Sequence, residues 1–243
     1  MTPKEIQILQ VKCNIIEEKI KLEYIDQTGN CKAVPDGIVN VPTYGGSDYR
    51  ILWILKEPYD EIIDGIASGG GDPMSDFVFP DGFAGRMGKS AQTWHPIIYV
   101  TYGILNDFIL WDEMKTIKND PSMADVAKHI AVINVNKIPA LTKSDMSTIE
   151  VAYHKHKELL HNQIRIYEPQ IIIGGSVLPL FYDELGLKKN DEKNFGSVEY
   201  YEKDNQLFIA AYHPSQYSTV IRENYVNDII ELAMIWTKKH SII

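Results

Sequence analysis

Three short runs of mostly aliphatic residues constrain the fold of this chain more than any other feature. They are Arg50–Leu55, Ile130–Asn134 and Ile171–Gly175, and each ends at polar residues or at glycine. A strand whose side chains are apolar on both faces lies inside a sheet covered on both sides, which is typical of parallel strands. We therefore expect these runs to form the centre of a parallel sheet.

Helical patterns separate these runs along the chain. Helices are predicted over four long segments and one short one, at 3–25, 95–110, 147–167, 224–239 and 177–185. Two further strands, at 198–201 and 207–212, flank a turn. Strands that alternate with helices indicate an α/β domain with helices on both faces of the sheet. No change in composition marks a linker, so we expect one domain over residues 1–243.

Composition excludes several classes of protein. Hydrophobic residues make up 44% and charged residues 23%, values that exclude a wholly disordered chain. No apolar run approaches the roughly 20 residues that a membrane span needs. The only cysteines, Cys13 and Cys31, cannot build a disulfide framework or a four-thiolate metal site. We expect a reduced, cytoplasmic protein without a metal or a cofactor, and the oligomeric state stays open.

Polar side chains follow three of the predicted strands. The segments are Lys56–Asp60, Asn134–Lys137 and Tyr212–Ser218. In open parallel sheets, ligands bind beyond the carboxyl ends of the strands. Taken singly, Glu57 could be a solvated strand end, and Asn134 and His213 could be structural turn and loop residues. Their occurrence together at strand ends favours a common site.

The same three segments, in this order, resemble motifs of the uracil-DNA glycosylase superfamily. Leu55–Asp60 is similar to its G-Q-D-P-Y-type motif, Ile133–Lys137 to its strand asparagine, and His213–Ser218 to its H-P-S-P-L-S-type loop. The resemblance covers about residues 48–238 and leaves 1–47 as an N-terminal helical and loop extension. It implies a three-layer αβα fold with a central, mainly parallel four-stranded sheet.

The resemblance and the chemistry of base excision assign roles to the first two motifs and to His213. An enzyme that acts on a base in a duplex must extrude the nucleotide into a pocket. Asn134 would read the edge of the base, Tyr59 would exclude a 5-methyl group, and Phe83 would stack on the base. His213 would stabilise the negative charge that develops on the departing base. The carboxylate of Glu57 would favour the cationic sugar and orient the attacking water.

The remaining candidates would contact DNA, which is the expected partner. Ser215 and Ser218 would bind backbone phosphates, and Tyr217 would fill the space that the base vacates. Lys137 is expected to add positive charge at the strand ends. The formal net charge of −9 weighs against a phosphate-rich partner, although DNA contact needs positive potential around one cleft only.

Several positions depart from the family pattern and indicate a divergent member. Leu55 replaces a glycine, Glu57 replaces an aspartate, Gln216 replaces a proline and Tyr217 replaces a leucine. Two cysteines are too few for the iron–sulfur cluster of one bacterial branch. Besides a DNA glycosylase, the sequence is compatible with a non-catalytic module that binds a nucleobase, nucleotide or protein. A hydrolase of free nucleosides is a third possibility.

Overall fold

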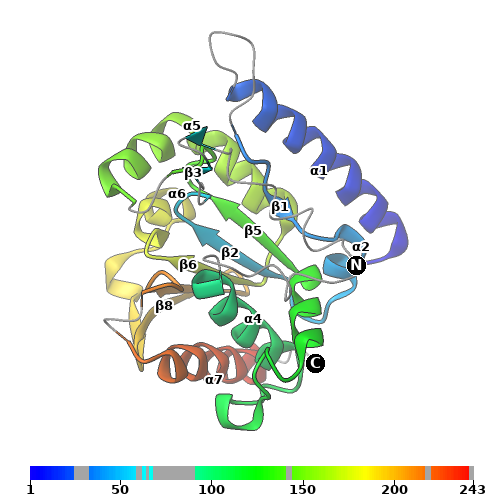
Figure 1. The fold of residues 1–243 in the computed structure, drawn as a ribbon, viewed down its shortest axis with the longest axis vertical. Helices are drawn as coiled ribbons and strands as arrows, with labels where there is room; N and C mark the ends of the chain where they lie inside the picture. The colour runs from blue at the N-terminus through cyan, green and yellow to red at the C-terminus, as the bar shows by residue number, and fades with distance from the viewer. Residues whose placement is uncertain are drawn as a thin grey trace.

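The structure of this chain is a computed structural model that describes most of the sequence. The described residues are 1–24, 33–58, 62–63, 66–67, 91–140, 144–216 and 220–240. A central sheet carries helices on both of its faces (Figure 1). The α/β class expected from the sequence is confirmed.

The central sheet is mixed and has seven strands within the described ranges. In spatial order these are β1 (Gly37–Ile38), β5 (Ile130–Asn134), β2 (Ile51–Leu55), β6 (Ile171–Gly175), β9 (Gln206–Ala211), β8 (Val198–Lys203) and β7 (Lys193–Phe195). Neighbouring strands among β5, β2, β6 and β9 pair in parallel, whereas β1, β8 and β7 pair antiparallel. The sheet is therefore larger than the four strands expected, because β8 and two strands too short to carry a periodic pattern, β1 and β7, join the four parallel strands. A separate pair is formed by β3 (Ile62–Ile63) and β4 (Ile66–Ala67).

The helices are α1 (Pro3–Glu23), α2 (Val41–Gly46), α4 (Ala91–Leu105), α5 (Met146–Tyr167), α6 (Tyr182–Leu185) and α7 (Arg222–His240). They lie close to the predicted segments, except for α2, where the sequence predicts no helix. Short 3₁₀ turns are η2 (Trp111–Glu113), η3 (Pro121–His129), η4 (Leu178–Phe181) and η5 (Lys189–Asp191). The helix expected to reach residue 110 ends at Leu105, because Asp107 and Phe108 both adopt a positive φ of 58°.

Both faces of β2 are buried, which explains its unbroken apolar sequence. Ile51, Trp53 and Leu55 pack in a cluster with residues of α4, α7 and η3. Leu52 and Ile54 pack in a second cluster with residues of α1, α2, α5 and η4. Full burial of one such side chain stabilises the fold by about 1.5–3 kcal/mol. The sheet is thus enclosed by two layers of helices, and its edges remain available for a site.

The helix α1 begins at a capping box formed by Thr2 and Glu5. One side of the helix packs against α5. Another side of the helix exposes the hydrophobic side chains of Ile8, Val11, Ile15 and Leu22. Among the described residues, no helix has the length and apolar character needed to cross a membrane.

Part of the expected N-terminal extension belongs to the core of the fold. The strand β1 pairs with β5, and α2 buries Val41 and Tyr44. Asp36, immediately before β1, is 8% exposed and contacts the end of β5. Residues 33–47 therefore complete one side of the sheet.

Candidate functional site

The chain segments that leave β2 and β5 run side by side at the carboxyl edge of the sheet. Backbone N–H groups of Val135 and Asn136 donate to the carbonyl groups of Leu55 and Lys56, both at 2.9 Å. Glu57, which follows Lys56, is half-buried. The first two sequence motifs therefore lie next to each other in space.

Asn134 is the last residue of β5 and is only 6% exposed. Side chains alternate between the faces of a strand, and Ile130 and Val132 pack in the cluster that contains α4 and α7. Asn134 has the same parity, so its amide faces that layer at the carboxyl edge. Among the hydrogen bonds between described residues, those of Asn134 are made by its backbone.

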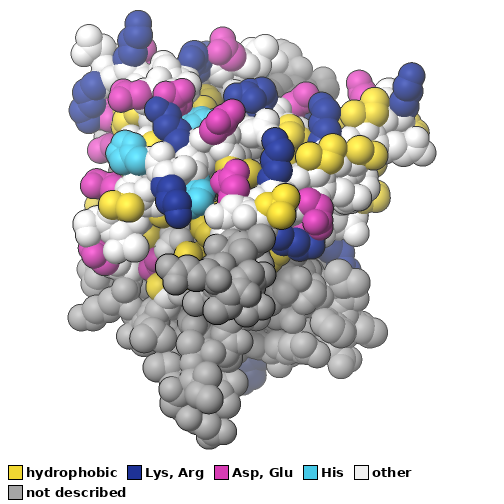
Figure 2. Space-filling view, turned by 90° about the horizontal axis from the view of Figure 1, so that it is seen from above, with side chains coloured by type: hydrophobic (Ala, Val, Ile, Leu, Met, Phe, Trp, Pro, Cys, Tyr) yellow, Lys and Arg dark blue, Asp and Glu magenta, His cyan; other side chains and the backbone are white. Residues whose placement is uncertain are grey.

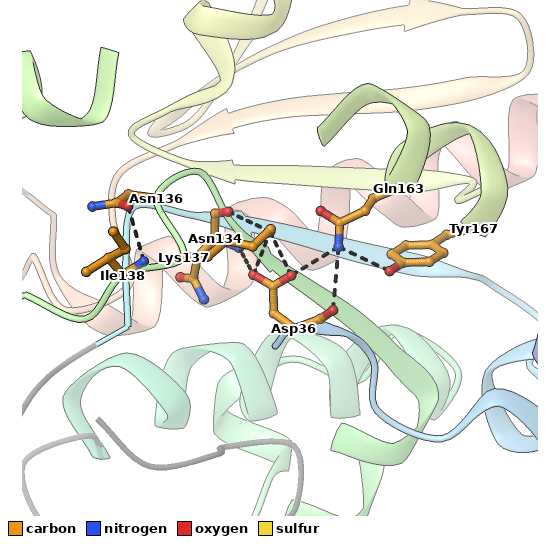
Figure 3. Close-up of polar contacts among 7 residues, drawn as sticks. All are labelled: Asp36, Asn134, Asn136, Lys137, Ile138, Gln163 and Tyr167. Carbon is orange, nitrogen blue, oxygen red and sulfur yellow. Dashed lines mark hydrogen bonds and ion pairs between the residues drawn. The ribbon is translucent and has the colours of Figure 1, made fainter. Parts of the chain in front are cut away.

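A buried polar network holds the backbone of Asn134 (Figure 3). Asp36 Oδ2 accepts the Asn134 N–H at 2.7 Å, and Lys137 Nζ donates to the Asn134 carbonyl at 3.0 Å. Lys137 and Asp36 form an ion pair at 2.8 Å, and both side chains have no exposed surface. Gln163 of α5 donates to Asp36 Oδ1 at 3.0 Å and to the Tyr167 hydroxyl at 3.2 Å.

The prediction that Lys137 contacts DNA is therefore wrong. Its side chain is fully buried, so no phosphate can reach the ammonium group. Burial lowers the pKa of Lys137, and the adjacent carboxylate of Asp36 opposes this shift. The ammonium group has three donors, and Asp36 Oδ1, Asp36 Oδ2 and the Asn134 carbonyl accept from them. The contacts fit a charged lysine with a structural partner.

The loop after β9 packs closely against the end of β6. A Cβ atom on Gly175 would lie 3.1 Å from Pro214 Cδ, 3.2 Å from Leu55 Cδ2 and 3.6 Å from His213 Cα. The backbone N–H of His213 donates to Ser176 Oγ at 2.8 Å. Glycine at position 175 thus lets the His213 loop approach the end of β2.

The surroundings of His213 select a neutral imidazole with its proton on Nε2. The backbone N–H of Ser215 donates to Nδ1 at 3.3 Å, and Ser215 Oγ lies 2.8 Å from the same atom. A backbone N–H can only donate, so Nδ1 is the acceptor and the ring proton belongs on Nε2. Burial and, to a smaller extent, the ammonium group of Lys56 lower the pKa of His213 to about 4. At neutral pH the ring therefore offers an uncharged N–H donor.

The structure brings Glu57, Asn134 and His213 to the same edge of the sheet. Among the described residues, these three side chains make no direct hydrogen bond to one another. Ser215, predicted to bind a phosphate, contacts His213 Nδ1 through its hydroxyl. Four other predicted site residues lie outside the described residues, namely Tyr59, Phe83, Tyr217 and Ser218.

Sequence reasoning missed the residues that support this edge. Asp36 lies in an irregular, glycine-rich segment with no periodic pattern, and Ser176 lies in the turn that follows the glycines of β6. His95, in the second turn of α4, is half-buried, and burial and the charge of Arg222 lower its pKa. A charged residue directly before a strand is the one signal that could have singled out Asp36.

The described part of the chain contains no group of three His, Cys, Asp or Glu side chains arranged to hold a metal ion. Burial raises the pKa of the Cys13 thiol to about 11, so this thiol is protonated and unreactive at neutral pH. No family model matches the sequence, and no curated protein matches it either. Function is therefore inferred from the residues at the carboxyl edge of the sheet.

Proposed function

We propose that this chain is a cytoplasmic DNA glycosylase-like hydrolase that removes uracil or another deaminated base from DNA. One observation carries the proposal: a neutral His213 donor and the nearly buried amide of Asn134 lie at the same carboxyl edge of the sheet. A base released from a nucleoside develops negative charge on its oxygen atoms. A fixed donor and a fixed amide at one edge suit the recognition and departure of such a base.

The arrangement of the strands supports a uracil-DNA glycosylase-like αβα fold. The parallel strands lie in the order β5, β2, β6, β9, so the strands that carry Asn134 and Glu57 are neighbours. The strand that leads to His213 lies two positions from β2, and its loop turns back toward Leu55 across Gly175. This proximity of the three strand ends supports the proposal that the three motifs form one site.

The proposed reaction starts with a nucleotide extruded from the DNA. Asn134 offers an amide oxygen as acceptor and an amide N–H as donor for one edge of the base. As the glycosidic bond breaks, electrons move onto the base, and the Nε2–H of His213 stabilises its oxygen without prior loss of a proton. The carboxylate of Glu57 stabilises the cationic sugar and orients the water that adds to it, and the proton that this water loses neutralises the departing anionic base.

The other predicted roles belong to the same proposal. Tyr59 would restrict the space beside carbon 5 of the base, and Phe83 would stack on its ring. Ser215 and Ser218 would contact phosphates, and Tyr217 would occupy the gap left in the duplex. The hydroxyl of Ser215 donates its one hydrogen to His213 Nδ1, so it would have to give up this contact to donate to a phosphate.

A cleavage assay tests the proposal. Wild-type protein is incubated with oligonucleotides that contain uracil or hypoxanthine, and abasic sites are converted to strand breaks on a gel. We expect His213→Ala and Asn134→Ala each to lower the rate by about 100-fold or more, as for loss of one donor in a preorganised site. His154→Ala, at an exposed position of α5, is the control with unchanged activity. A wild-type protein that neither cleaves nor binds these oligonucleotides contradicts the proposal.

A non-catalytic nucleobase-binding module on the same fold is the second candidate. The burial of Lys137 removes one predicted DNA contact, and the net charge of −9 opposes DNA binding. Acidic and basic side chains are also mixed on the face shown in Figure 2. This candidate predicts binding of free uracil without strand cleavage, and calorimetry with the free base alongside the gel assay separates the two.

A further inference from the structure

The backbone of Asn134 lies beyond the last residue of β5 that pairs with β1. The strand β1 pairs only with Val132 and Ala131 of β5. The N–H of the next residue, Val135, points to the other side of β5 and donates to the Leu55 carbonyl at 2.9 Å. Both backbone polar groups of Asn134 therefore face the β1 side, beyond the last paired residue of that strand.

Two side chains replace the missing ladder at this point. The carboxylate of Asp36 accepts the Asn134 N–H, and the ammonium group of Lys137 donates to the Asn134 carbonyl (Figure 3). The same two groups bind each other, so they close a ring of charge-assisted hydrogen bonds around one peptide segment. Charge-assisted hydrogen bonds are shorter and stronger than neutral ones, and they fix geometry well.

The desolvation cost of this buried ion pair indicates that it does more than stabilise the fold. Both side chains are fully buried, and desolvation of two charges cancels much of their attraction. An apolar pair of similar volume would serve the core as well, but it could not bind the N–H and carbonyl of Asn134. The carboxylate is also supported from α5 by Gln163, which adds a second layer of orientation.

We propose that Asp36 and Lys137 are positioning residues that hold the Asn134 backbone and thereby fix its amide at the base-binding edge. The assignment rests on the proposed function, because it gives the pair a role in recognition of a base through Asn134. An error of about 1 Å in such a group can cost about 100-fold in rate. The pair binds the Asn134 backbone from the β1 side of β5, whereas the side-chain amide faces the layer of α4 and α7.

Catalysis tests the proposal through a double-mutant cycle. The variant Asp36→Asn/Lys137→Met removes both charges together, so no unpaired charge remains buried. We expect it to lower kcat/KM on uracil-containing DNA by about 10-fold to 100-fold. In an Asn134→Ala background the same change should alter kcat/KM by no more than about 2-fold. Equal losses in both backgrounds overturn the positioning role, since general loss of structure does not depend on Asn134.

Tyr167→Phe is the matched control. It removes the hydroxyl at the far end of the same network, which contacts Gln163 but not Asn134. We expect kcat/KM to stay within about 2-fold of wild type, because the hydrogen bonds of Asp36 and Lys137 to the Asn134 backbone remain in this variant. Thermal unfolding followed by circular dichroism confirms that each variant is folded under the assay conditions.

An NMR measurement separates failure of this inference from failure of the proposed function. In the charge-free double variant, the backbone amide of Asn134 should exchange with solvent about 10-fold faster or more, and its side-chain amide signal should shift. Tyr167→Phe should change neither. If wild type cleaves no lesion but these changes occur, the proposed function is lost and the backbone role of the pair stands. Unchanged exchange and an unchanged amide signal overturn the inference, whatever the activity.

Discussion

His213 shows how a loop sets the chemistry of a single side chain. Its ring nitrogen Nδ1 accepts a hydrogen bond from the backbone N–H of Ser215. The backbone N–H of His213 donates to Ser176 Oγ. Burial and the Lys56 charge disfavour protonation and bring the pKa down to about 4. A protonated histidine in this place would direct a second donor at the Ser215 N–H. The neutral form is the one that the loop accommodates.

The lowered pKa predicts how stability depends on pH. An unfolded histidine has a pKa of about 6.5, so between pH 6.5 and 4 the unfolded chain binds more protons at His213 than the folded one. Stability is therefore lost as the pH falls through this range, by up to about 3 kcal/mol. Urea denaturation from pH 7.5 to 4.5 should show a smaller loss for His213→Gln than for wild type. Lys56→Met should give an intermediate curve, and three identical curves contradict the assigned environment.

At the scale of the elements, the loop after β9 packs closely against the ends of β2 and β6. The strand β6 ends in two glycines, and the His213 loop crosses over the second one. The aliphatic sequences of β2, β5 and β6 are sufficient to predict these strands, since only buried central strands are apolar on both faces. The approach of the loop depends on the absence of one Cβ atom, which no periodic pattern reveals.

Gly175→Ala tests this approach. The added methyl group would meet Pro214 Cδ at 3.1 Å and Leu55 Cδ2 at 3.2 Å, and the proline ring has little freedom to move. We expect a loss of about 1–3 kcal/mol in the free energy of unfolding, as for other overpacked sites. The control Gly46→Ala, with nothing within 4 Å of the new atom, should be neutral or slightly stabilising. Urea denaturation measures both, and equal stabilities for the two variants contradict the packing.

At the scale of the whole molecule, a residue of the N-terminal segment completes the end of a central strand. Asp36 and Lys137 are separated by 101 positions in sequence. Their pairing joins the segment before β1 to the turn after β5, while Gln163 connects Asp36 to α5. The part of the N-terminal extension from residue 33 onward is therefore needed by the core.

Stability measurements on this pair should be strongly non-additive. Asp36→Asn or Lys137→Met alone leaves one buried charge without its partner, which costs about 3–5 kcal/mol. The double variant removes both charges and should cost less than either single variant. Urea denaturation of the four proteins gives the coupling energy. Additive losses would show that the two side chains do not act as a pair.

The salt dependence of DNA affinity tests whether Lys137 is inaccessible to phosphates. The logarithm of affinity falls with the logarithm of salt concentration by about 0.9 for each neutralised phosphate. The double variant Asp36→Asn/Lys137→Met should keep the wild-type slope, because neither group reaches a phosphate. Lys56→Met, at the half-buried end of β2, should reduce the slope by about 1. Fluorescence anisotropy at several salt concentrations gives these slopes, and a reduced slope for the double variant contradicts the burial of Lys137.

The sequence by itself determined the central strands, the long helices and the strand ends at which Glu57, Asn134 and His213 occur. These features follow from local patterns, because an apolar run and its polar stop are visible in neighbouring residues. Only the tertiary structure decided that Lys137 is buried and that Asp36 is its partner. A lysine can contact DNA or complete a core, and the choice depends on whether a carboxylate distant in sequence offsets the cost of desolvating its charge.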